Sequence, residues 1–352
     1  MTLAAIMAGL HAGGQRLKDI RMVVFGAGSA GVGIADMVCD AIAADGDNES
    51  KSTTSDAAKQ IWLVDKPGLL LTSTSSLDNA QKIYARGEGE SDWHGKDTTS
   101  LLEVIKEVKP NVLVGTSTKP GAFTEEVVRA MASHVDRPVI LPLSNPTRLH
   151  EAVPEDLLKW TDGKALVATG SPFEPVKGPW GKDGQEVEIE VAECNNSVVF
   201  PGIGLGGVLS RSTLVTDKML RAAVSGVVAL SPALNSRSSS DGDDNNNNNK
   251  TDDKTDDKDV TYPLLPGVED VRAVSVRVAR EVIIAAVEEG VADMDVGIPY
   301  GKDNKDNDLE ELDEWIREQM WEPIYRPLRR VDPGPEASRE AKGELKVVGS
   351  LS

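Results

Sequence analysis

A glycine-rich turn near the start of the chain restricts the possible folds more than any other feature. Gly26, Gly28 and Gly31 have the spacing G-x-G-x-x-G in the string FGAGSAG. In such a turn the first glycine permits a tight bend after a strand. The second lets the backbone approach a pyrophosphate, and the third lets a helix pack close to the sheet. The pattern is weak alone, but a strand pattern precedes it at 22–25 and a helical pattern follows at 30–43.

The start of that helix completes a predicted phosphate site. Around Ser29 and Ala30 the helix presents backbone N–H groups and the positive end of its dipole, which suits a phosphate. These two residues therefore join the three glycines as predicted cofactor-binding residues.

The rest of the chain alternates short apolar runs with amphipathic stretches. The apolar runs are continuous, as in parallel strands covered on both faces. They predict strands at 22–25, 61–64, 112–115, 139–143 and 165–169. Helical patterns lie between them at 30–43, 99–107, 123–134 and 154–160. This alternation predicts an α/β fold, a doubly wound Rossmann-type parallel sheet with helices on both faces. Further helical patterns at 268–292 and from Leu309 to Pro323 predict a C-terminal helical extension.

Two polar segments interrupt this pattern, at 44–60 and 236–260. We expect both to be surface insertions. The second is of low complexity and too polar to bury a core, so we expect it to be disordered. An acidic docking segment is the alternative interpretation of its charge. The predicted dinucleotide-binding domain then comprises 1–235 and 261–330, with a flexible tail at 331–352.

Composition argues against several classes of partner. With 57 acidic and 38 basic residues the formal net charge is −19, which repels nucleic acid and anionic membranes. The two cysteines form no C-x-x-C pair, as expected in a reducing compartment. No apolar run reaches the ~20 residues of a membrane span. The apolar start, MTLAAIMAGLHA, lacks the basic residues of a secretion signal. We expect it to be a helix packed on the core of a longer protein that is not secreted.

An acidic residue ends the second predicted strand. Asp65 follows IWLV, and its carboxylate can accept hydrogen bonds from the ribose hydroxyls of an adenosine. It lies further from the glycine motif than the usual ~20 residues, and the insertion at 44–60 accounts for the excess. A carboxylate there favours NAD over NADP. Lys66 and Lys82 leave NADP open, because either could pair with a 2′-phosphate.

Six longer strings are far more specific than the glycine motif. They are FGAGSAGVGIAD, IWLVDKPGLL, VGTSTKPGAFTEEVVRAMA, RPVILPLSNPT, ATGSPFEPV and CNNSVVFPGIGLG. In this order they resemble the NAD-binding domain of the malic enzyme family, and the later YPLL and MWEPIYRPL resemble its C-terminal end. The resemblance implies oxidative decarboxylation of malate to pyruvate and CO2, with NAD or NADP and with Mg²⁺ or Mn²⁺. It also implies a cytoplasmic or mitochondrial protein that forms homo-oligomers.

The resemblance also implies roles for particular residues. Asn145, in LSNPT, corresponds to a family asparagine that contacts malate near the nicotinamide. Asn195 corresponds to another that contacts substrate, and Asn196 beside it is expected at the cofactor. From the residues alone, an Asn-Pro turn at Asn145 and a helix cap at Asn195 are the favoured interpretations. Thr116 and Ser117 follow the third strand, where the loop runs close to the cofactor in this fold class.

No catalytic residue and no metal ligand is predicted in this chain. The resemblance implies that the family's lysine, tyrosine and three metal-binding carboxylates lie in sequence that precedes this chain. The four histidines share no ligand spacing, and Asp92 with His94 is a weak metal candidate. We therefore expect an incomplete malic enzyme that is inactive alone. The alternative is a non-catalytic NAD(P)-binding module or partner subunit. Another Rossmann dehydrogenase would share the fold but would not explain the asparagine motifs.

Overall fold

The computed structural model describes residues 1–44, 53–87, 93–238, 262–301 and 308–322. Within these residues a seven-stranded sheet has the order β3–β2–β1–β4–β5–β6–β9. Its strands are β1 (Met22–Phe25), β2 (Ile61–Asp65), β3 (Gly68–Leu69), β4 (Val112–Gly115), β5 (Val139–Pro142), β6 (Leu166–Thr169) and β9 (Ala192–Glu193). Neighbouring strands are parallel except β3, which is antiparallel to β2. This confirms the predicted doubly wound α/β class.

The strand order reverses at β1, and this position locates the ligand edge of the sheet. β1 pairs with β2 on one side and with β4 on the other. The helices that follow β1 and β4 therefore leave the sheet towards opposite faces, which opens a crevice at the carboxyl ends of the strands.

Alternate residues of the strands feed two separate apolar cores. Met22 and Val24 of β1 belong to one core, together with α1 (Thr2–Ala12) and α2 (Ser29–Ala44). Val23 belongs to the other, with α5 (Leu101–Val108), α6 (Glu125–Ala132) and α7 (Pro154–Trp160). Both faces of the sheet are thus covered, as the continuous apolar runs predicted. The first helix packs on the core, also as expected.

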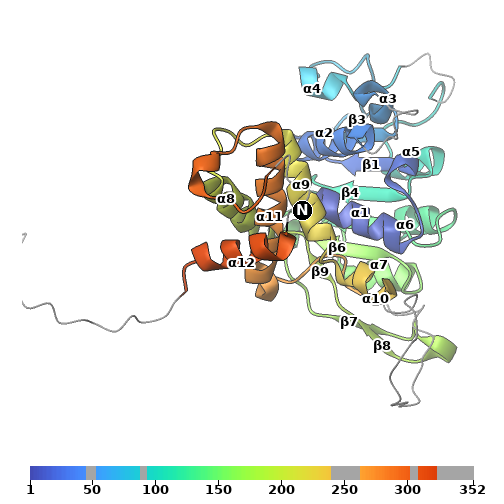
Figure 1. Ribbon diagram of the computed structural model, residues 1–352. Helices are drawn as coiled ribbons and strands as arrows, with labels where there is room; N and C mark the ends of the chain where they lie inside the picture. Colours follow the sequence, from blue (N-terminus) through green and yellow to red (C-terminus); the bar gives the residue numbers. More distant parts are fainter. Residues whose placement is uncertain (45–52, 88–92, 239–261, 302–307, 323–352) are drawn as a thin grey trace, which may run out of the picture. The chain divides into compact units, whose positions relative to one another are not determined.

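Further helices lie beyond the last strands. They are α8 (Phe200–Leu209), α9 (Asp217–Val228), α10 (Pro232–Ser238), α11 (Val271–Glu289) and α12 (Leu309–Gln319). α11 packs against both α8 and α9 (Figure 1). A Cβ on Gly202 of α8 would come within 2.6 Å of the Val278 side chain, so the small residue permits this close helix packing. α11 and α12 form the predicted C-terminal extension, whereas α8, α9 and α10 were not predicted.

Shorter elements complete the described fold. They are the helices α3 (Thr54–Ala58) and α4 (Asn79–Lys82) and the antiparallel hairpin of β7 (Val176–Gly178) and β8 (Val187–Ile189). Single 3₁₀ turns lie at Leu17–Asp19, Thr147–Leu149, Lys182–Gly184, Asn196–Val198, Val268–Asp270 and Met294–Val296.

The structure changes some predicted boundaries. The end of the polar segment 44–60 forms α3, because Thr53 caps that helix by accepting the N–H of Asp56. The last helix ends at Gln319 rather than Pro323. The proline disfavours helical backbone only at Glu322, so it does not by itself account for the earlier end. The low-complexity segment lies outside the described residues from position 239 onward, as does the tail at 331–352. Among the described helices, none is both long and apolar enough to cross a membrane.

Candidate functional site

The glycine turn connects β1 to α2, and its three glycines differ in the space around them. Gly26 is buried with φ +114°, and a Cβ there would lie 2.5 Å from the carbonyl carbon of Thr116. A Cβ on Gly31 would lie 1.9 Å from the carbonyl oxygen of Gly26. At Gly28, which is exposed, a Cβ would meet no heavy atom within 4 Å. The protein's own packing therefore requires the first and third glycines, whereas the second leaves open space at the start of α2.

The backbone of Ala27, inside this turn, is hydrogen-bonded on both sides. Asp65 Oδ2 accepts the N–H of Ala27 at 3.2 Å, and Oδ1 accepts the N–H of Lys66 at 2.8 Å. Gln81 Nε2 donates to the carbonyl oxygen of Ala27 at 2.8 Å. Gln81 is itself fixed in a capping box with Asp78 at the start of α4. The orientation of the turn is therefore set by β2 and α4 as well as by its own glycines.

The loop after β4 contacts the same turn. The Thr116 hydroxyl donates to the carbonyl oxygen of Gly26 at 2.8 Å, and the Thr116 N–H donates to that of Phe25, also at 2.8 Å. Because β1 and β4 are neighbours, this loop and the glycine turn form one continuous edge.

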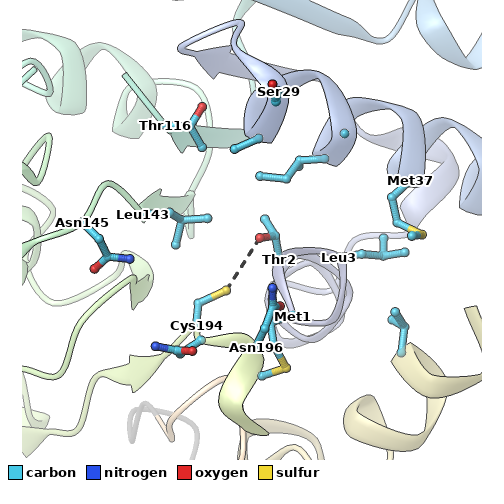
Figure 2. Close-up of a pocket in the computed structure, with 15 residues that line it drawn as sticks. Met1, Thr2, Leu3, Ser29, Met37, Thr116, Leu143, Asn145, Cys194 and Asn196 are labelled. Atoms are coloured by element: carbon cyan, nitrogen blue, oxygen red, sulfur yellow. Dashed lines mark hydrogen bonds between the residues drawn. The ribbon is translucent and has the colours of Figure 1, made fainter. Parts of the chain in front are cut away.

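A cavity of about 480 Å³ lies along this edge (Figure 2). Figure 2 shows Thr116, Leu143 and Asn145 on one side, and the first residues of α1 facing them. The cavity is lined by Met1, Thr2, Leu3, Ser29, Ala30, Gly33, Ile34, Met37, Thr116, Leu143, Asn145, Cys194, Asn195, Asn196 and Val224. Six predicted site residues are thus brought together from four separate stretches of sequence. They are Ser29, Ala30, Thr116, Asn145, Asn195 and Asn196.

The three asparagines differ in their surroundings. Asn145 is exposed, and its Oδ1 accepts a hydrogen bond from the Ser171 hydroxyl. Asn195 caps the 3₁₀ turn that follows it, because its Oδ1 accepts the N–H of Ser197 at 3.0 Å. Its Nδ2 donates to Glu193 at 3.1 Å. The helix-cap alternative for Asn195 is therefore correct, although the residue also lines the cavity. Asn196 is exposed in the cavity wall.

Other predicted residues lie beside the cavity rather than in its wall. Asp65 is half-buried at the end of β2, and Lys66 is exposed next to it. Gly26 and Gly31 are outside the cavity wall and allow the close packing of the turn. The Ser117 hydroxyl points away from the cavity, since it donates to Glu151 at 2.8 Å and accepts the N–H of Lys119 at 3.1 Å. A role for Ser117 at the cofactor stays a prediction.

Sequence reasoning missed the apolar wall and one buried carboxylate. Leu143, Met37 and Val224 carry no chemical motif, and they line one cavity only in the folded chain. Cys194 also lines the cavity, where burial raises the pKa of its thiol, so the neutral form is favoured. Glu151 is fully buried and follows the LSNPT string closely. Its position just after that string is the only sequence signal that could have pointed to it.

The part of the chain that the structure describes does not fit a divalent cation. Among the described residues, no group of three His, Cys, Asp or Glu side chains could hold a metal ion. His94 is exposed, and its weak partner Asp92 lies outside the described residues.

The fold and the cleft together define a doubly wound dinucleotide-binding domain. Comparison with known proteins is more specific. Residues 1–240 match the family described as "Malic enzyme, NAD binding domain". The chain belongs to the malic enzyme family, as its motifs predicted.

Curated relatives extend the match over almost the whole chain. The mitochondrial NAD-dependent malic enzyme of Saccharomyces cerevisiae is 42% identical over 341 residues, which are 95% of this chain and 45% of that protein. NAD-dependent malic enzyme 3 of Bacillus subtilis is 39% identical over 94% of this chain and 51% of its own length. The chain spans about half the length of the curated relatives it matches.

Solved structures agree on the fold. The crystal structure of Entamoeba histolytica malic enzyme has a TM-score of 0.60 at 20% identity, and it covers 90% of this chain and 51% of that chain.

Proposed function

We propose that the chain binds NAD at the carboxyl ends of its parallel strands and forms the cofactor half of a malic enzyme site. The activity of that site is the oxidation of malate to pyruvate and CO2. One observation carries the proposal. The open space at Gly28 stands at the N-terminus of α2, next to a cavity that contains Asn145 and Asn196. Relatives named NAD-dependent malic enzymes support the choice of cofactor and reaction.

The geometry suggests how NAD lies along the edge. The first turn of α2 presents N–H groups without intrahelical partners, and with the helix dipole these suit the pyrophosphate. Asp65 lies on the β2 side, where the adenosine half binds in this fold class. The nicotinamide half then lies towards Thr116 and Asn145, beyond β4 and β5. Bound NAD supplies the hydride acceptor for the oxidation.

The proposed substrate contacts are made by amides. An asparagine side chain can donate to a carboxylate and accept from a hydroxyl without adding charge. Asn145 lies in the loop after β5 and lines the cavity. Asn195 is held by its cap to Ser197 and by Glu193, so its position is defined before any ligand binds. Both would orient malate beside the nicotinamide.

Asp65 determines the preference between NAD and NADP in this proposal. Each carboxylate oxygen accepts one backbone N–H and keeps acceptor capacity for a ribose hydroxyl. We expect Asp65→Asn to weaken NAD about tenfold and NADP less, because the substitution removes the charge that repels a 2′-phosphate. Calorimetric titration of both nucleotides tests this. A tenfold loss of affinity for both nucleotides would mean that Asp65 only holds the glycine turn and does not discriminate between NAD and NADP.

The function is tested with the 352-residue chain itself. NAD and NADP are titrated by calorimetry, and then L-malate and Mn²⁺ are added while the absorbance of reduced nicotinamide is recorded. Binding without reduction assigns the chain a cofactor-binding role, either as half of an enzyme or as a partner subunit. Malate-dependent reduction shows that this chain contains a complete site. Failure to bind either nucleotide overturns the proposal. The protein is proposed to be mitochondrial or cytoplasmic. A fluorescent fusion of the full gene product distinguishes the two locations.

A further inference from the structure

A buried carboxylate lies directly behind the cavity wall. Glu151 precedes α7 and is fully buried. Its Oε1 accepts the N–H and the hydroxyl of Ser117, both at 2.8 Å, and the hydroxyl of Ser144 at 2.5 Å. Ser117 belongs to the loop after β4, and Ser144 to the loop after β5. One oxygen atom therefore joins two loops that lie on neighbouring strands.

The same two loops present their other residues to the cavity. Thr116 lines the cavity whereas Ser117 turns back to Glu151. Leu143 and Asn145 line it whereas Ser144, between them, turns back. The alternation follows from extended backbone, in which successive side chains point to opposite sides. Fixing the two serines therefore fixes the residues on the front of each loop.

Two additional contacts tie the loops together. The Ser144 hydroxyl accepts the N–H of Thr118 at 2.9 Å, so it is shared between the loops. The carbonyl oxygen of Glu151 accepts the N–H of Phe123 at 2.9 Å. The last residue of β4 makes room for the carboxyl group, because a Cβ on Gly115 would lie 2.5 Å from Glu151 Cδ.

The burial of this carboxylate lowers the stability of the folded chain. Oε2 of Glu151 is buried and has no hydrogen-bond partner in the described part of the chain. Burial of an incompletely paired carboxylate opposes folding. The network is therefore better explained by the positions it imposes than by the stability it adds.

We propose that Glu151 is a positioning residue, which holds the loops after β4 and β5 so that Thr116 and Asn145 contact the nicotinamide half of the dinucleotide. This inference rests on the proposed function. It assigns Glu151 no contact with the adenosine half, which lies on the β2 side of the switch point.

Comparison of NAD with ADP-ribose, which lacks the nicotinamide ring, tests the proposal in the full 352-residue chain. Ser144→Ala removes one hydroxyl, and Glu151→Met removes the acceptor with little change in size. We expect each to weaken NAD about tenfold while ADP-ribose binding changes less than about twofold, since the loss is that of hydrogen bonds to a charged group. Glu151→Gln keeps an acceptor oxygen and should restore most of the preference for NAD.

A matched control separates positioning from general damage. The Ser231 hydroxyl is fully buried and donates to the carbonyl oxygen of Leu264 at 2.8 Å, away from the cavity wall. Ser231→Ala should change neither ligand's affinity, even if it lowers the melting temperature as much as Ser144→Ala. A double-mutant cycle adds a second measurement. Gly115→Ala should reduce the preference for NAD in the wild type and have little effect in the shortened variant Glu151→Ala, where the clash is absent.

The outcomes are distinct. An equal loss of NAD and ADP-ribose overturns the positioning role, as does a wild type that binds both ligands with the same affinity. If the wild type binds neither ligand, the proposed function itself fails.

Discussion

The open space at Gly28 allows cofactor binding to be removed without unfolding the protein. A Cβ at this position meets no heavy atom within 4 Å, and the residue has no left-handed backbone. Gly28→Ala should therefore fold normally. In the proposed binding mode, the added methyl group would occupy the space through which the pyrophosphate approaches the first N–H groups of α2.

The contacts at each glycine set the expected change in NAD affinity and in the free energy of unfolding. For Gly28→Ala we expect NAD binding to weaken by about 2 kcal/mol, or about 30-fold, as for the loss of one strong hydrogen bond to a phosphate. Its free energy of unfolding should stay within about 1 kcal/mol of the wild type, since a poorer helix cap and a stiffer unfolded chain offset each other. Gly31→Ala is the contrasting variant. Its Cβ would lie 1.9 Å from the Gly26 carbonyl oxygen, so we expect a loss of about 2–4 kcal/mol of stability.

Calorimetric titration with NAD and urea denaturation of the same samples provide the assay. Gly204→Ala is the matched control, because Gly204 is an exposed glycine in α8 with equally open space and lies outside the cavity wall. It should add about 0.5–1 kcal/mol of stability and leave NAD binding unchanged. Wild-type affinity in Gly28→Ala would refute the assignment of the pyrophosphate to this turn. Unfolding of Gly28→Ala would refute the conclusion that its space is free.

Three further predictions concern buried polar groups. Arg86→Met should lower the free energy of unfolding by about 3 kcal/mol in urea denaturation. The reason is that one guanidinium nitrogen of Arg86 donates to three carbonyl oxygens, including that of Ile61 at 2.6 Å. A change under about 1 kcal/mol would contradict this. Arg280→Met leaves the half-buried Asp313 without its 2.9 Å partner, so we expect a loss of about 2–3 kcal/mol and faster amide exchange in α12. Unchanged exchange there would show that the pair does not anchor the helix. Burial lowers the pKa of His150, so the folded chain binds its proton less tightly than the unfolded chain, and the stability from the neutral ring is lost as pH falls below about 6.5. Between about pH 7.5 and about pH 5.5 the wild type should therefore lose more stability than His150→Phe, and equal losses would show that this ring does not contribute.

Much of the fold could be predicted because parallel strands covered on both faces leave continuous apolar runs. The strands at 22–25 and 112–115 have the predicted bounds, and β2 extends one residue further to include Asp65. The strands of two or three residues, β3, β7, β8 and β9, were not predicted. A segment so short has no periodicity, and its pairing depends on which strand the tertiary fold places beside it.

The candidate site divides in the same way. The glycine spacing, Asp65 and the asparagine strings could be predicted, since each is a local pattern tied to one turn or strand end. The direction of Ser117 could not be predicted. Its hydroxyl faces Glu151, and that contact joins residues 34 positions apart in sequence.

The sequence by itself determined the class of fold, the position of the glycine turn and the family, because these depend on local periodicity and short strings. Tertiary structure alone decided the cavity. Its wall joins the start of α1, the first turns of α2, the ends of β4 and β5, the asparagines that follow β9 and Val224 of α9. It also decided which of two neighbouring residues lines that cavity and which turns back to Glu151. The physical reason is that close packing and hydrogen bonding act between residues near in space, whereas sequence patterns report only neighbours along the chain.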